Sequence, residues 1–459
     1  MRSALRGDNL IMKEESKEEL FTNRQLWALL LPVMLEQVLN ALMGMVDTMM
    51  VSNVGSVAIS AVSLVDSINT LVIQVFSALA AGGTIICSQY LGKGDKDGAN
   101  QAAGQALLSI LTISVVLTAI CVLFRHPLLS LIFGKVEADV MANSLNYFLL
   151  TALSYPFIAA FNSGSALFRA QGNSRLPMAV SVISNLMNVA GNAVLIFGLK
   201  MGVGGAALST LISRIFCAVT VLYFLRKPGR DIVVDHYRKI RPDRRLIFSV
   251  LAVGVPAGVE NGMFQFGKLV IQSTVSAMGT TAIAANAMAA IFEMVNGMPA
   301  VGMGIGLMTV VGQCIGAGRD DEAKRYIKKI SLWAEGVMIL SCLIVFAAAK
   351  PVTILAGMET EAAVLCLEMA LAITIAKPLF WVPAFTLVSG MRAAGDVKFS
   401  MITSSITMWV CRVSFTMLLA HIGMGPMAVW LGMFSDWIVR GIIFTIRFFS
   451  GRWLAHKLV

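Results

Sequence analysis

Charge is scarce in this 459-residue sequence, in which 14% of the residues are charged and 57% are hydrophobic. Soluble domains carry roughly 25% charged residues, so the composition excludes a water-soluble fold. The apolar residues form stretches of about 20 to 30 residues, such as 25–51, 101–124 and 327–348, and about 20 residues cross the hydrocarbon of a bilayer as a helix. About twelve such stretches predict an all-α polytopic membrane protein.

Motifs of enzymes and metal sites are missing as well. The seven cysteines are scattered, without a CxxC pair or ligand spacing, which indicates neither a metal site nor a disulfide. The sequence has no HExxH motif, no nucleophile elbow and no filter-like loop of a channel, so we expect neither an enzyme nor a cofactor. The first two dozen residues lack the layout of a cleavable signal peptide, and the first apolar stretch is expected to remain as a helix.

The positive charges are distributed unevenly in a sequence whose net charge is +10. Of the 36 lysines and arginines, 27 fall on one side of the predicted membrane, four fall on the other side, and five lie within helices. Because cytoplasmic loops carry an excess of Lys and Arg, we predict a multi-pass protein of a bacterial inner membrane with both termini and the basic segment 226–245 in the cytoplasm. The same bias accounts for the net charge without a nucleic-acid partner.

The sequence repeats itself at a nearly constant offset, close to half its length. Four pairs align: Pro32 with Pro256, Gly55 with Gly279, Gln89 with Gln313, and Arg169 with Arg392. Six helices in each half give both halves the same orientation, so that a pseudo-two-fold axis runs along the membrane normal. We therefore predict an N-terminal lobe (1–225), a cytoplasmic linker (226–245) and a C-terminal lobe (246–459), with six helices in each lobe.

Five segments form an ordered set along the first half. They are "PVMLEQVLNALMGMVDTMMVSNVG" (32–55), "SQYLGKGD" (88–95), "FRAQGNSRLPM" (168–178), "NLMNVAGNAVLIFG" (185–198) and "GVGGAALST" (202–210). Through this set, repeated by halves, the chain resembles the multidrug and toxic compound extrusion (MATE) family over essentially its whole length. The resemblance implies two six-helix lobes around a central cavity, antiport of a drug-like substrate against Na⁺ or H⁺, and an ion site in the N-terminal lobe.

Asp47 is the sharpest candidate for a functional residue. A charged side chain within the bilayer costs about 2.5 to 3.5 kcal/mol on insertion scales, so such residues usually face a cavity and serve function. Glu36 and Asn40 precede Asp47 by eleven and seven residues, which places all three on one face of the first helix. A carboxylate satisfied by neighbouring polar groups, or wetted near the surface, is the alternative interpretation.

The fifth helix carries a stripe of polar side chains at spacings of 4, 3 and 4: Ser181, Asn185, Asn188 and Asn192. Amide oxygens suit a hard cation, although hydrogen bonding between helices explains such a stripe equally well. In the family that the chain resembles, a cation site is formed by the positions that match Asp47, Asn188, Asn192, Thr210 and, through its carbonyl group, Ala206. Some members have Asp at Asn192, so this chain keeps one carboxylate, which weakens cation binding or favours protonation of Asp47.

The C-terminal lobe departs from the family pattern, because Phe264 and Trp381 stand where many members carry acids. A second ion site is therefore not expected there. We expect the substrate cavity to be lined by Glu36, Gln37, Asn40, Glu260 and Glu293, and a structural pairing role for Glu260 and Glu293 stays open. Four cations within helices need partners on other elements: Arg214, Lys268, Lys377 and Arg412. Asp436 and Arg440, four residues apart, can satisfy each other.

These features predict a secondary antiporter that exports drug-like, often cationic, organic molecules by alternating access of two lobes. Asp47 would exchange H⁺, or bind Na⁺ together with Asn188 and Asn192. The expected partners are small organic substrates and the lipid bilayer, and the expected state is a monomer. The alternative is a flippase of lipid-linked oligosaccharides or cell-wall precursors from the same superfamily, which more cavity cations and helices beyond twelve would favour.

Overall fold

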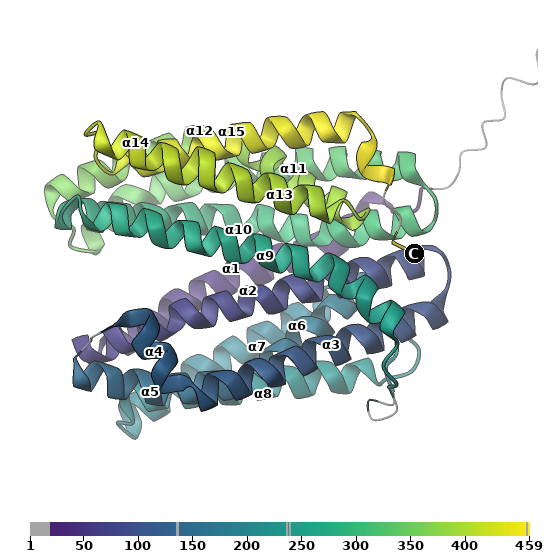
Figure 1. The fold of residues 1–459 in the computed structure, drawn as a ribbon, viewed down its shortest axis with the longest axis horizontal. Helices are drawn as coiled ribbons and strands as arrows, with labels where there is room; N and C mark the ends of the chain where they lie inside the picture. The colour runs from purple at the N-terminus through teal and green to yellow at the C-terminus, as the bar shows by residue number, and fades with distance from the viewer. Residues whose placement is uncertain (1–18, 135–136, 236, 238–239, 456–457) are drawn as a thin grey trace, which may run out of the picture.

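The computed structural model describes residues 19–134, 137–235, 237, 240–455 and 458–459, and these residues form helices and connecting turns without a strand (Figure 1). The elements of the first half are α1 (Asn23–Ser52), α2 (Ser56–Gly92), α3 (Lys96–Leu123), α4 (Arg125–Phe133), α5 (Ala138–Leu153), α6 (Tyr155–Ala170), α7 (Arg175–Asn192), the π-helix η1 (Ala193–Gly198) and α8 (Gly202–Leu225). Those of the second half are α9 (Arg244–Ser276), α10 (Thr280–Gly316), α11 (Asp320–Leu355), α12 (Thr360–Ala393), α13 (Val397–Thr407), the π-helix η3 (Met408–Ser414), α14 (Phe415–His421), α15 (Met427–Phe449) and the 3₁₀ turn η4 (Arg452–Ala455).

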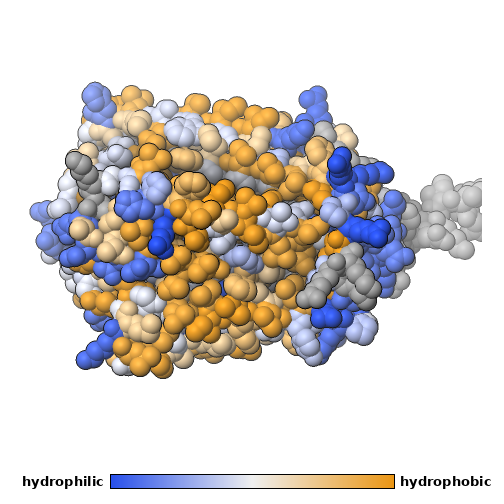
Figure 2. Space-filling view, turned by 60° about the horizontal axis from the view of Figure 1, so that its bottom comes forward, coloured by the Kyte–Doolittle hydropathy of each residue, from blue (hydrophilic) through white to orange (hydrophobic). Residues whose placement is uncertain are grey.

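The helices have the length and composition of membrane spans. Among the described residues, eleven helices are long and apolar enough to cross a membrane, and α5 with α6 forms a twelfth span that is bent by 41°. Pro156, the second residue of α6, accounts for the bend, because its ring cannot continue the preceding helix. Figure 2 shows an apolar belt between two hydrophilic ends. The expected all-α polytopic fold of about twelve helices is thus confirmed; the basic tail before residue 19 and Lys135 lie outside the described residues.

The two halves of the chain form two groups of helices, α1 to α8 and α9 to α15, that lie side by side (Figure 1). The described chain begins and ends at the same end of the molecule, which we call the terminal end. The linker between the halves packs along the first group here, where Asn100 accepts a hydrogen bond from the amide of Val233 at 2.8 Å and Tyr237 donates to the carbonyl oxygen of Leu222 at 2.6 Å. These hydrogen bonds hold the described part of the linker against the first group.

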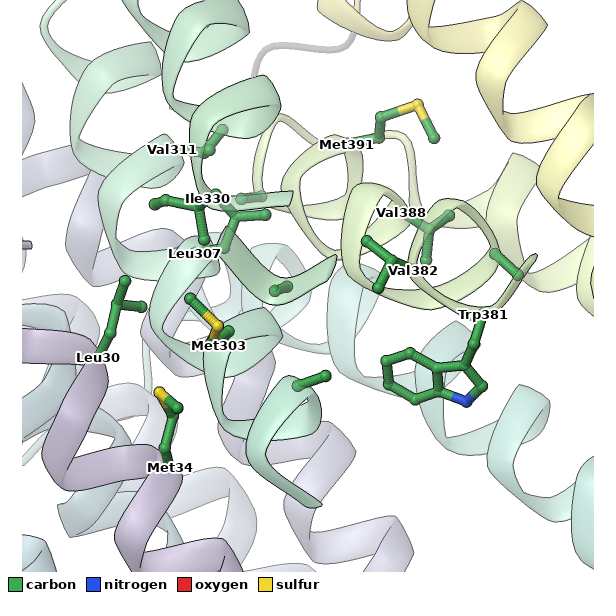
Figure 3. Packing of buried hydrophobic residues seen from close by; sticks show 14 of the residues in the cluster. Leu30, Met34, Met303, Leu307, Val311, Ile330, Trp381, Val382, Val388 and Met391 are labelled. Atoms are coloured by element: carbon green, nitrogen blue, oxygen red, sulfur yellow. The ribbon is translucent and has the colours of Figure 1, made fainter. Parts of the chain in front are cut away.

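The two groups pack closely through symmetric pairs of helices, α1 with α10 and α2 with α9. A Cβ atom on Gly82 would lie 2.6 Å from the carbonyl oxygen of Val250, and one on Gly302 would lie 2.7 Å from the Cα atom of Met34. Leu30 and Met34 of α1 face Met303 of α10 in this contact (Figure 3). Small residues let the helix backbones approach, and the pairing follows the predicted sequence repeat.

The terminal end is closed by the crossing of α2 and α10. A Cβ atom on Gly92 would lie 2.8 Å from the Cα atom of Gln313, and one on Gly316 would lie 2.8 Å from that of Gln89. Each glutamine also donates a hydrogen bond across the interface, Gln89 to the carbonyl oxygen of Ala393 at 2.7 Å and Gln313 to that of Ala170 at 2.8 Å. These contacts repeat by the same offset as the sequence.

The opposite end of the molecule is open. A cleft of about 880 Å³ lies between α1, α2 and α4 on one side and α9 on the other. Its lining includes Thr48, Asp66, Ser67, Phe266, Lys268 and Gln272. The lobes therefore meet at the terminal end and separate toward the other end, as expected for one of the two states of an alternating-access protein.

Candidate functional site

The polar stripes predicted on α1 and α7 face each other. Asn40 on α1 accepts hydrogen bonds through Oδ1 from Ser181 and from Asn185 on α7, each at 2.8 Å. Farther from the terminal end, Asp47 on α1 accepts a short hydrogen bond from the side-chain amide of Asn192 on α7. The first and fifth predicted spans are thus joined by a polar seam along their length.

The five residues predicted to hold an ion lie together at the end of this seam that is farther from the terminal end. Asn188 donates to the hydroxyl oxygen of Thr210 at 3.2 Å, and Thr210 donates to the carbonyl oxygen of Ala206 at 3.0 Å. Asn192 is fully buried, and its Oδ1 atom has no hydrogen-bond partner among the described residues. One carboxylate, amide oxygens, a hydroxyl and a carbonyl form an oxygen-rich set that fits a hard cation such as Na⁺.

A second carboxylate, Asp66 on α2, lies near this set, and the sequence analysis did not single it out. It accepts hydrogen bonds from Asn69 at 3.1 Å and from the hydroxyl group of Tyr147 at 3.2 Å. Arg214 interacts electrostatically with both Asp66 and Asp47 and donates to the hydroxyl oxygen of Ser154 at 2.6 Å. The signal was present in the sequence, because Asp66 interrupts the apolar stretch of the second span.

Glu36 and Glu260, both expected to line the substrate cavity, lie in ion pairs inside their lobes. Arg169 contacts the two carboxylate oxygens of Glu36 at 2.7 and 2.8 Å, and Arg392 contacts those of Glu260 at 2.6 and 2.7 Å. Both carboxylates are buried. Arg169 and Arg392 align with each other in the sequence repeat, so the two ion pairs occupy equivalent positions in the two halves.

The family follows from a match to both halves of the chain. The family model described as MatE fits residues 32–194 and again residues 256–418, two segments that begin at the aligned prolines of the repeat, Pro32 and Pro256. The chain belongs to the MatE family. This is the multidrug and toxic compound extrusion family whose resemblance the sequence indicated, so the chain is a membrane transporter and not an enzyme.

Full-length relatives and solved structures agree with this assignment. The uncharacterized transporter YisQ of Bacillus subtilis is 26% identical over 94% of each chain. The probable multidrug resistance protein NorM of Thermotoga maritima is 26% identical over 97% of this chain and 95% of the relative. A crystal structure of MATE in the straight conformation superposes with a TM-score of 0.83 at 20% identity, over 94% of this chain and 100% of that chain, which shows the shared MATE fold.

The C-terminal lobe of this MATE transporter holds further buried charges. Lys377 pairs with Glu293 at 2.6 Å and also donates to Oδ1 of Asn296 at 2.7 Å. Asp436 and Arg440 pair within α15 at 3.1 Å, as their spacing predicted. Glu293, expected at the substrate cavity, thus takes part in an ion pair while its side chain stays 25% exposed.

Two other residues expected at the cavity, Gln37 and Asn40, lie on α1 and are partly exposed and exposed, respectively. Lys268, by contrast, lies on the lining of the cleft, and it interacts electrostatically with charged side chains of α10, α12 and η3. The spacing of residues within single helices did not indicate the polar lining of the cleft, which consists of Thr48, Ser63, Asp66, Ser67, Thr70, Gln265, Lys268 and Gln272.

Proposed function

We propose that this MATE transporter exports drug-like organic molecules in exchange for H⁺ or Na⁺, by alternating access of its two lobes. The observation that carries the proposal is the Asp47 carboxylate of α1, bonded to Asn192 of α7 within a cluster of oxygen donors. The names of relatives support the substrate class, since proteins similar over nearly the whole chain are described as probable multidrug resistance proteins.

The position of Asp47 on α1 supplies a route for coupling. At one end α1 contacts the ion cluster through Asp47, and nearer the terminal end it packs on α10 of the other lobe through Leu30 and Met34. An ion or proton that changes the bond between Asp47 and Asn192 therefore acts on a helix that is part of the interface between the lobes. A ligand shifts such an equilibrium only by its difference in affinity for the two states.

The cleft is the proposed entry to the substrate site. Its volume of about 880 Å³ falls in the range of about 300 to 1,000 Å³ that is typical of small-molecule sites. We assign the terminal end to the cytoplasm because Lys and Arg are concentrated in its loops, so the cleft opens to the outside. In this assignment Glu36 and Glu260 each stabilise their own lobe through an ion pair within that lobe. Asn40 and Glu293 remain candidates for contact with substrate.

The second candidate function is the flipping of lipid-linked oligosaccharides or cell-wall precursors. The cations of the C-terminal lobe favour it, whereas the twelve spans among the described residues do not add the extra helices expected of a flippase. Reconstituted protein that moves a fluorescent lipid-linked sugar but no soluble dye would support this second candidate.

Proteoliposomes that contain ethidium test the proposed antiport, with a pH gradient and a Na⁺ gradient imposed in separate experiments. We expect one of the gradients to drive ethidium transport by the wild-type protein, and Asp47→Asn to reduce it to the level of protein-free vesicles because the exchangeable carboxylate is lost. Asp139→Asn is the matched control, since Asp139 is an exposed acid of α5 outside the cluster. Undiminished transport by a folded Asp47→Asn variant would exclude coupling through Asp47.

A further inference from the structure

A pair of cations shares one aromatic ring in the C-terminal lobe. The Nζ atom of Lys268 on α9 lies 5.0 Å from the centre of the Phe264 ring, and the Cζ atom of Arg412 on η3 lies 4.8 Å from it. Contact with an aromatic face stabilises a cation without neutralising it. The two positive charges therefore stay available to a third, anionic group.

Arg412 lacks the hydrogen-bond acceptors that a buried guanidinium requires. The residue is 6% exposed, and its Nε and Nη1 atoms have no hydrogen-bond partner among the described residues. Nη2 donates only to the thioether sulfur of Met433, which is a weak acceptor. The carboxylate of Asp436 approaches Nη1 no closer than 4.0 Å and is bonded to Arg440 instead. Because unsatisfied buried donors are costly, an acceptor that bonds to the free N–H groups of Arg412 would stabilise this part of the protein.

The surrounding charges leave an excess of positive charge. Four cations interact with one another and with two carboxylates in this part of the lobe: Lys268, Lys377, Arg412 and Arg440, with Glu293 and Asp436. Lys377 and Arg440 already have carboxylate partners. Lys268 has no ion pair within 4.0 Å in the part of the chain that the structure describes, and it lines the open cleft.

The sequence repeat breaks at these positions. At the offset set by the aligned prolines, Asp47 of the first half aligns with Ile271, and Lys268 of the second half aligns with Gly44. The ion pairs of Glu36 and Glu260, by contrast, are repeated. The two lobes are therefore alike in their internal ion pairs. Near the cleft they are opposite in charge, because the N-terminal lobe is negative there and the C-terminal lobe is positive.

We propose that Lys268, Arg412 and Phe264 form an anion-binding recess, which takes a carboxylate, sulfonate or phosphate group of an amphipathic substrate. The apolar body of that substrate lies against Phe266 and Leu269, two exposed residues of α9 that line the cleft together with Lys268. The proposal deepens the proposed function, on which it rests for the statement that the bound molecule is transported. It adds anionic and zwitterionic molecules to the substrate class.

Two dyes with the same ring system and opposite charge test the recess: fluorescein, an anion, and rhodamine 123, a cation. Their affinities for the purified full-length protein in lipid-free detergent are measured by fluorescence anisotropy. Lys268→Gln is expected to weaken fluorescein binding by about tenfold, as the loss of one charge-assisted hydrogen bond predicts, and to change rhodamine 123 binding by less than about twofold. Lys268→Glu is expected to make the protein prefer rhodamine 123.

Lys350→Gln is the matched control, because Lys350 is an exposed lysine of α11 outside the cleft lining, and its affinities should equal those of the wild type. Lys268 lies on the cleft surface, so its variants are expected to fold, while Arg412→Gln serves as a second variant after its monodispersity is checked. Fluorescein affinity that is equal in the wild type and both Lys268 variants, or no fluorescein binding by the wild type, would overturn the proposal.

Competition experiments separate the two sources of such an anion. Displacement of fluorescein by benzoate supports a soluble substrate, and displacement only by phosphatidylglycerol supports the phosphodiester headgroup of a lipid. Both outcomes retain the anion-binding recess. Because the binding assay uses no ion gradient, the two failures are distinguishable. Failure of the recess would appear as fluorescein affinity that the Lys268 variants leave unchanged, whereas failure of the coupling scheme would appear as gradient-driven ethidium transport that Asp47→Asn leaves undiminished.

Discussion

The crossing of α2 and α10 at the terminal end depends on two glycines, and replacing Gly92 with alanine tests whether this crossing keeps the end closed. The added Cβ atom would lie 2.8 Å from the Cα atom of Gln313, whereas ordinary contacts begin at 3.4 Å. The obstacle is backbone and not a flexible side chain, so rotation of a side chain cannot relieve it. Because the carbonyl oxygen of Gln313 lies closer still than its Cα atom, the helices must separate by more than about 0.6 Å.

The separation disturbs the two hydrogen bonds that cross the interface, from Gln89 to Ala393 and from Gln313 to Ala170. Each hydrogen bond contributes about 0.5 to 1.5 kcal/mol net. The loss of both amounts to about 1 to 3 kcal/mol, which shifts the equilibrium between two states about 5- to 150-fold. We therefore expect Gly92→Ala to favour the state in which the terminal end is open and the cleft is closed.

Maleimide labelling of Ser67→Cys measures this shift, because Ser67 is exposed on the lining of the cleft. The labelling rate, corrected for the parent protein without Ser67→Cys, should fall when Gly92→Ala is added. Gly336→Ala is the control, since a Cβ atom there meets nothing within 4 Å. An unchanged rate in folded Gly92→Ala protein would refute the role of the crossing as a gate.

Two further predictions concern stability. Glu36→Gln removes the buried carboxylate that pairs with the partly buried Arg169 and should lower the free energy of unfolding by about 3 kcal/mol, seen as a lower Tm in detergent. Adding Arg169→Met should recover most of this loss, and strictly additive losses would contradict the pairing. Burial raises the pKa of Tyr237 in the linker to about 12, above the ordinary value of about 10. The neutral phenol is favoured in the folded state, so its stabilisation is complete below about pH 10 and is lost as the pH rises toward 12. The Tm difference between the wild type and Tyr237→Phe should shrink over that range, and a constant difference would argue against it.

The sequence determined the features that depend on position along one helix. Apolar stretches of sufficient length predicted the spans, and the internal repeat at a constant offset predicted two equivalent halves, which the structure and the match to both halves confirm. The stripes on α1 and α7 were predicted because residues three, four or seven apart share one face of a helix. Asp47 was singled out because a charge in an apolar span needs polar partners.

The tertiary structure alone decided which faces meet. Glu36 and Arg169 are 133 residues apart, and nothing in their spacing indicated that they pair with each other. The same holds for Lys268 and Arg412, which become neighbours because α9 and η3 place them on one ring. Spacing along a helix fixes which side chains share a face, whereas the choice of opposing helix, and of the end at which the lobes separate, depends on packing among all the helices.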